Sequence, residues 1–169
     1  ESKDAFEVRE FSVFEKMSSL FDVSLTLVSP DPDVAFDAVV GRPARFAIEH
    51  GGGVRFWSGI CDEMGLVDVD DDGLSTYRLS LSPVLWLATQ RRDYRVFQHL
   101  SEVDIALSVL EKWKVEPAVR LERAGFRKRQ YRVQYGESDY FFFRRMLEEA
   151  GVAFYFEQDG DETRLVLSD

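Results

Sequence analysis

Apolar and polar residues alternate strictly over residues 21–27, and this pattern constrains the fold more than any other feature of the chain. Each apolar member is separated from the next by one polar residue: Phe21, Val23, Leu25 and Leu27. Successive side chains of a strand point to opposite faces, so the spacing predicts a strand with one buried and one solvated face. Pro30 and Pro32 end the strand, because proline lacks the N–H group that a sheet ladder needs.

Further strands and tight turns follow. Residues 42–50 and 54–67 are predicted strands joined by Gly51–Gly53, since glycine tolerates the positive φ angles of a tight hairpin. Gly59 and Gly65 inside the second strand predict bulges or sharp bends, as in a sheet that curls toward a barrel. A second turn leads into another alternating strand, whose apolar members are Tyr77, Leu79 and Leu81.

The second half of the chain carries helix signals. Ser101 and Asp104 have the spacing of a capping box, which predicts an amphipathic helix over residues 102–113. After a predicted strand near residues 131–135, Ser138 is an expected N-cap, and the helix it begins is expected to end before Gly151. A closing hairpin is predicted over residues 152–167.

These elements predict a mainly β (α+β) fold. Successive antiparallel strands separated by turns favour a barrel or sandwich. The expected organisation is an antiparallel barrel-like lobe over residues 1–96, followed by a smaller α+β lobe with two helices over residues 97–169.

Composition excludes several classes of function. In 169 residues, 45% are apolar and 14% aromatic, which is ample for a packed core. The 31 Asp and Glu against 21 Lys and Arg give a net charge of −10, which disfavours nucleic acid and anionic lipid as partners. The basic run Arg127–Arg129 is too short to reverse that conclusion. No membrane span is predicted, and residues 1–20 lack the pattern of a secretory signal.

Few residues could carry thiol or imidazole chemistry. Cys61 is the only cysteine, so neither an internal disulfide nor a thiolate zinc site is possible. Together with His50 and His99 it could supply nucleophile chemistry only if the fold brought them together. A half-buried cysteine and two surface or turn histidines are favoured, and no catalytic residue is predicted.

Two glycine-containing turns resemble ligand loops. Asp68, Asp70, Asp72 and Gly73 fit the opening of an EF-hand, but Leu79 stands where a bidentate Glu is needed, so an acidic hairpin turn is favoured. Gly51–Gly53 lacks the Lys-Ser/Thr pair and the following helix of a phosphate cradle. Neither a metal nor a cofactor is therefore predicted, and no pair of carboxylates stands out for glycoside hydrolysis.

The aromatic block Tyr140–Phe143 lies within the second predicted helix. At helical spacing its four rings cannot all share one face. Packing in the core is favoured, and the alternative is a ring exposed at a subunit or effector contact.

Several longer segments resemble one family in order and spacing. They are GRPARF, RFWSGI, YRLSLSPVLWLATQRRDYRVFQHLSEVDIALSVL, YRVQYGESDYFFFRRMLEEAGVAFYF and TRLVLSD. From about Phe11 to Asp169 the chain is similar to the N-terminal head of VgrG proteins, the spike components of type VI secretion. The resemblance implies a phage tail hub-like fold and a structural, non-enzymatic role.

The resemblance also implies partners and location. The parent would be a homotrimer whose ring docks on the hexameric tube protein, Hcp, and which carries a PAAR-type tip protein and effectors. It would assemble in the bacterial cytoplasm and then be secreted into the medium or a target cell. A second barrel, an OB-like domain and a β-helix spike are expected after Asp169. The residues that form the trimer or partner interface remain unassigned.

Two alternatives belong to other functional classes. An effector-associated hydrolase domain would need a cleft containing two acids with strongly shifted pKa values. A monomeric adaptor would bind an effector through an acidic face, and its binding would be sensitive to salt.

Overall fold

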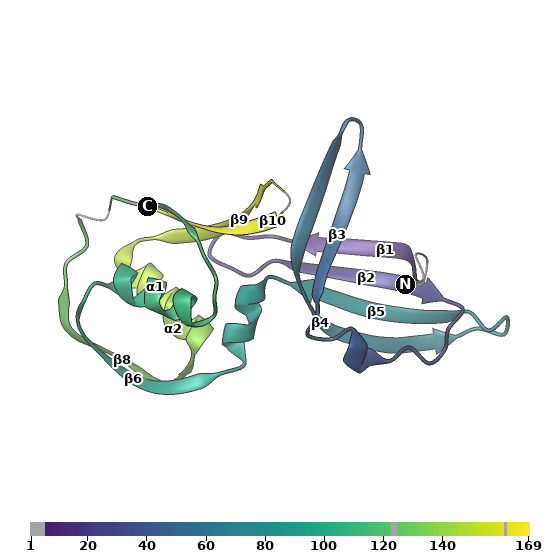
Figure 1. Cartoon of the computed structure of the whole chain (residues 1–169), viewed down its shortest axis with the longest axis horizontal. Helices are drawn as coiled ribbons and strands as arrows, with labels where there is room; N and C mark the ends of the chain where they lie inside the picture. The colour runs from purple at the N-terminus through teal and green to yellow at the C-terminus, as the bar shows by residue number, and fades with distance from the viewer. Residues whose placement is uncertain (1–5, 123–124, 161) are drawn as a thin grey trace. The chain divides into compact units, whose positions relative to one another are not determined.

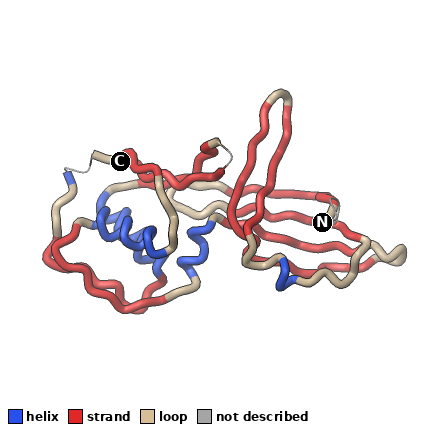
Figure 2. Tube along the Cα trace, in the orientation of Figure 1, coloured by secondary structure: helices blue, strands red, loops and turns tan. Residues whose placement is uncertain are grey.

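The computed structural model describes residues 6–122, 125–160 and 162–169. The chain forms two compact units, which are shown in Figures 1 and 2. The strand unit contains the chain up to residue 15 together with residues 21–83, and the α+β unit contains residues 16–20 and 84–169. The predicted boundary at residues 96 and 97 falls within a strand of the α+β unit, which is therefore larger than the segment assigned from sequence. The division into lobes over residues 1–96 and 97–169 stays a prediction.

The strand unit is one antiparallel sheet of five strands in the order β1-β2-β5-β4-β3. The sheet is open and curled, which confirms the predicted antiparallel, barrel-like architecture. Figure 1 shows the hairpin of β3 and the start of β4 standing out from the other strands. The strands are β1 Glu7–Phe14, β2 Asp22–Ser29, β3 Pro43–His50, β4 Gly53–Val69 and β5 Ser75–Ser82, with a short 3-10 helix, η1, at Phe36–Ala38.

The alternating residues of β2 bury the face that the sequence predicts. Val23 pairs with Leu81 of β5, and Leu27 pairs with Tyr77, so large apolar groups meet across the two central strands. Val23 and Tyr77 are completely buried. Burial of such side chains stabilises a fold by roughly 1.5 to 3 kcal/mol each, so this face is the core of the strand unit.

The long strand β4 contains two bulges, and neither is at a predicted glycine. The register shifts show that Asp62 and Val67 are the extra residues. Gly59 has another role, because a Cβ atom there would lie 2.0 Å from the carbonyl oxygen of Ser82. Gly65 lies between the two bulges, and a Cβ atom there would meet nothing within 4 Å. The prediction of bends in this strand is therefore right, but glycine is not their cause.

The α+β unit packs two helices between two small sheets (Figure 1). β6 and β8 form an antiparallel ribbon, and the second sheet has the order β7-β10-β9, with β7 parallel to β10. The elements are η2 Val84–Thr89, β6 Arg92–Leu100, α1 Glu102–Lys112, β7 Ala118–Arg120, β8 Arg129–Ser138, α2 Asp139–Ala150, β9 Ala153–Asp159 and β10 Glu162–Ser168.

The ends of both helices are those predicted from local signals. The Ser101 hydroxyl accepts a hydrogen bond from the backbone N–H of Asp104 at 3.1 Å, which with the reciprocal bond completes a capping box at α1. Ser138 Oγ accepts from the backbone N–H of Phe141 at 3.2 Å at the start of α2. Gly151 follows α2 with φ +74°, a left-handed conformation that glycine adopts without strain.

The core of the α+β unit contains three of the four rings of the predicted aromatic block. Phe142 and Phe143 are completely buried and Tyr140 nearly so, whereas Phe141 is 61% exposed. Phe142 stacks on Phe97 with ring centroids 5.3 Å apart. Among the described residues, no helix is long and apolar enough to cross a membrane.

Candidate functional site

The β6–β8 ribbon has two faces of different chemistry. Tyr94 pairs with Tyr135 and Val96 with Val133, and these side chains share the outer face. On the inner face, Arg95 pairs with Gln134. Because side chains alternate along each strand, the inner face meets the helices while the outer face remains open.

A buried carboxylate fastens the inner face to the helices. Asp139, the first residue of α2, is completely buried and accepts hydrogen bonds from Arg95 at 2.6 Å, Gln134 at 2.9 Å and Trp113 Nε1 at 3.0 Å. Lys112 Nζ lies 3.3 Å from Oδ2, the carboxylate oxygen that also accepts from Trp113. Burial raises the pKa of Asp139, but these hydrogen bonds and the Arg95 charge lower it by more, so the pKa lies below its ordinary value.

A second buried carboxylate anchors the other end of the ribbon. Glu102 of α1 accepts from Arg129 Nε at 2.8 Å and from Arg132 Nη2 at 2.6 Å. Burial raises the pKa of Glu102, yet its own backbone N–H and the two guanidinium groups leave that pKa below the ordinary value. Asp139 and Glu102 both join β6–β8 to the helices through ion pairs. The ribbon that presents the outer face is therefore held firmly against the helices.

Large aromatic side chains cover the outer face. Tyr94 is 70% exposed and Tyr135 79% exposed, and their rings meet edge to face with centroids 5.2 Å apart. Val96 and Tyr131 are also exposed. Gly136 has φ +66°, and a Cβ atom there would lie 3.0 Å from the Tyr94 hydroxyl, so only glycine fits beneath this ring without strain.

Basic residues lie at both ends of the ribbon. Arg91 and Arg92 are at the start of β6, and Arg127 and Lys128 directly precede β8, which pairs antiparallel with β6. All four are exposed. Tyrosine and arginine are enriched in protein interfaces, where an apolar centre is surrounded by a polar rim. The composition of this face is therefore typical of a protein-binding surface, which makes it the candidate site.

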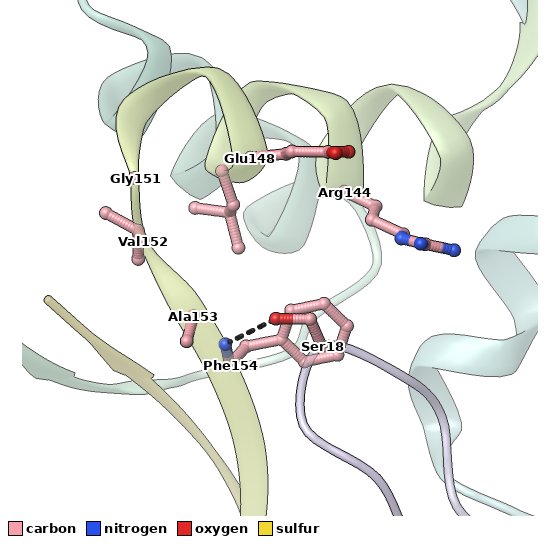
Figure 3. A pocket seen from close by; sticks show the side chains of 8 residues that line it. Ser18, Arg144, Glu148, Gly151, Val152, Ala153 and Phe154 are labelled. Carbon is pink, nitrogen blue, oxygen red and sulfur yellow. Dashed lines mark hydrogen bonds between the residues drawn. The ribbon is translucent and has the colours of Figure 1, made fainter.

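The α+β unit also has a shallow hollow beside α2 (Figure 3). It has a volume of about 320 Å³. Arg144 and Glu148 extend from the helix on one side, and Ser18 lies on the other (Figure 3). The Ser18 hydroxyl accepts a hydrogen bond from the backbone N–H of Phe154 at 3.4 Å. The described residues that line this hollow include no histidine, the base that most often activates a serine nucleophile.

The Cys61 thiol and the His50 imidazole, two of the three groups considered for nucleophile chemistry, lie far apart in the same sheet. His50 pairs with Gly53 at one end of the β3–β4 ladder, whereas Pro43 pairs with Ile60, next to Cys61, at the other. Seven residues of strand separate the two ends by about 23 Å. Cys61 is buried, and burial raises the pKa of its thiol, so it is not a reactive thiolate. His99 lies exposed in β6.

The two loops with ligand-like sequences are hairpin turns, as favoured from the sequence. Asp70 accepts hydrogen bonds from the backbone N–H groups of Asp72 at 3.0 Å and Leu74 at 2.8 Å, and strands flank the turn on both sides. Gly51 and Gly52 have positive φ angles and join β3 to β4. Within residues 6–122, 125–160 and 162–169, no three His, Cys, Asp or Glu side chains are grouped to hold a metal ion.

Comparison with known proteins assigns the family. Residues 14–169 match the phage tail baseplate hub (GPD) family. The chain belongs to this family. This chain is 31% identical over 159 residues to the type VI secretion system spike protein VgrG1b of Pseudomonas aeruginosa, covering 92% of this chain and 21% of that protein. It is 34% identical over 171 residues to VgrG4b of the same organism, covering 96% of this chain and 20% of that protein.

Solved structures share the fold of this chain. The E. coli c3393 protein, described as a type VI secretion component with structural similarity to bacteriophage T4 gp27 and gp5, aligns with a TM-score of 0.80 at 21% identity. The alignment covers 97% of this chain and 48% of c3393. A chain of a Francisella PdpA-VgrG complex aligns with a TM-score of 0.70 at 11% identity, and the alignment covers 96% of this chain and 27% of that chain. The resemblance to VgrG heads is thus confirmed, and this chain spans about a fifth of the length of the curated relatives that it matches.

The outer face of the ribbon was not identified from sequence. The strand near residues 131–135 is predicted, but its alternation of apolar and polar residues would place the tyrosine face in the core and the face of Arg132 and Gln134 in solvent. The sequence carries one signal for this face: a tyrosine lies close to arginines in each of the segments 91–94 and 127–131. Only the position of the helices shows which face is left uncovered.

Proposed function

We propose that this chain is the opening part of a type VI secretion spike hub and that its role is structural. The observation that carries the proposal is the hub-family match over residues 14–169. The similarity to several VgrG spike proteins over nearly the whole chain supports it. So does the fold shared with c3393.

The assembly follows from the same relationship. The parent would form a homotrimer, dock on the hexameric tube protein Hcp, and carry a PAAR-type tip protein and effectors. It would assemble in the bacterial cytoplasm and leave the cell through the type VI apparatus. A hub subjected to force needs a rigid body, and the ion-paired attachment of β6–β8 to both helices supports such a role.

Three acids with shifted pKa values support a non-enzymatic role. A hydrolase of the glycosidase type needs a general acid whose pKa is raised. Asp93, Glu102 and Asp139 instead have lowered pKa values, because hydrogen bonds and nearby cations stabilise their charged forms more than desolvation destabilises them. Each is held by Lys or Arg side chains, as in a structural ion-pair network.

The test uses the full-length parent protein. Light scattering coupled to gel filtration should give the mass of three copies, and a stable monomer would overturn the hub proposal. Purified tube hexamers should bind the intact trimer and should not bind a parent lacking residues 1–169. Equal binding by the shortened parent would show that this segment does not contribute to docking.

A further inference from the structure

The charge of the chain is divided unequally between the two units. The strand unit contains 16 Asp and Glu against 6 Lys and Arg, whereas the α+β unit contains 15 of each. The strand unit therefore carries the whole net charge of −10. Within the balanced α+β unit, the ribbon is basic: residues 91–100 and 127–138 hold seven Lys and Arg and two Asp and Glu.

The tip of the β4–β5 hairpin has the opposite character. We define this hairpin tip as residues 66–73, all of them exposed. It combines apolar side chains with a run of acids: Leu66, Val67 and Val69, with Asp68, Asp70, Asp71 and Asp72. Val67 is 57% exposed and is the extra residue of a bulge. Asp70 shapes the turn through its hydrogen bonds, which leaves Asp71 and Asp72 at the apex.

We propose that the outer face of the β6–β8 ribbon on one copy of the chain docks on the hairpin tip of a second copy. Both surfaces have an exposed apolar centre, and their charges are complementary: Arg92, Arg127 and Lys128 on the ribbon against Asp71 and Asp72 on the tip. Such complementarity directs association and selects the partner surface.

The alternative pairings of the same surfaces are disfavoured. Because both ends of the ribbon are basic, a symmetric contact between two ribbons would place basic side chains opposite one another, and a contact between two tips would bring their acids together. Like charges placed opposite each other cost free energy. The ribbon-to-tip contact is therefore heterologous, and a repeated heterologous contact can close into a ring. This inference rests on the proposed function, since a hub is built from several copies.

The first experiment reverses each surface separately. Sedimentation equilibrium of the 169-residue chain at low ionic strength should show association that depends on concentration and weakens as salt screens the charges. The ribbon variant R127E/K128E and the tip variant D71K/D72K should each lower the association constant by roughly tenfold or more. An equimolar mixture of the two variants should recover association, because each reversed surface then meets an opposite charge.

Matched controls separate this contact from a general charge effect. K16E/R144E makes the same charge change at exposed positions of the α+β unit outside the ribbon, and its association should equal that of the wild type. Y135S should weaken association by roughly tenfold without changing the circular dichroism spectrum, as expected for a central aromatic contact.

Several results would overturn the proposal. They are absence of self-association, association that neither charge reversal changes, failure of the mixture to recover association, and binding of a labelled oligonucleotide by the ribbon in place of a second copy. A full-length parent that is trimeric but unaffected by either charge reversal would overturn this contact and leave the hub function standing.

Discussion

Replacing Asp139 with asparagine should destabilise the α+β unit more than any other change of a single charged group at the ribbon. The substitution keeps the size of the side chain but removes its charge. It leaves Arg95 and Lys112 without their buried anion and directs an amide N–H group toward other donors. Trp113 Nε1 also loses a charged acceptor.

The size of the stability loss depends on how deeply Asp139, Arg95 and Lys112 are buried. Breaking a buried ion pair by removing one partner costs roughly 3 to 5 kcal/mol. Asp139 is completely buried, but the side chains of Arg95 and Lys112 are 23% and 27% exposed and regain part of their hydration. The lower end applies, so D139N is expected to lower the free energy of unfolding by about 3 kcal/mol.

The pH dependence of this loss has a definite sign. The pKa of Asp139 is lower in the folded protein than its ordinary value of about 3.9. Its stabilising contribution is therefore fully present above the unfolded pKa and is lost as pH falls through the folded pKa. The difference in stability between wild type and D139N should be largest near neutral pH and should shrink in acid below about pH 4.

Urea unfolding followed by circular dichroism at the helix band measures this effect, since α1 and α2 both belong to the α+β unit. Asp33→Asn, in an exposed loop, is the matched control and should change stability by less than about 0.5 kcal/mol. A double-mutant cycle with R95Q should give a coupling energy above about 1 kcal/mol. Equal urea midpoints for D139N and wild type would refute the reasoning.

Two further pairs of substitutions test the packing. Gly59→Ala should destabilise the strand unit by about 3 kcal/mol, because its Cβ atom would meet the Ser82 carbonyl, whereas Gly65→Ala has open space. Trp fluorescence during urea unfolding measures both, and equal midpoints would contradict the close approach. Phe142→Ala should cost about 4 kcal/mol and Phe141→Ala less than about 1 kcal/mol, since only the first ring is buried. Thermal unfolding distinguishes them, and comparable losses would disprove the assigned helix face.

Local signals in the sequence were sufficient for the helix ends and most hairpins. Ser101, Ser138 and Gly151 act through bonds or backbone angles within a few residues of themselves, so their effect does not depend on the rest of the fold. The alternation over residues 21–27 predicted the buried face of β2 for the same reason. These features persist in almost any tertiary setting.

Elements that depend on distant partners were not predicted. β7, Ala118–Arg120, is too short to show alternation and exists because it pairs with β10 near the end of the chain. β1 has mostly exposed residues and is a strand because it pairs with β2. The bulges at Asp62 and Val67 arise from the mismatch in length between β4 and β5. Strand pairing between residues far apart in the sequence determines these features, and no local sequence pattern indicates it.

By itself, the sequence determined the strand periodicity, the helix caps and the excess of acidic residues, because each is a property of neighbouring residues or of composition. Only the tertiary structure decided that Arg95 turns inward while Tyr94 and Val96 stay outside. A strand pattern would place a charged group in solvent and an aromatic group in the core. Here Asp139, far along the chain, supplies the buried anion that draws Arg95 inward, and the aromatic face is left uncovered.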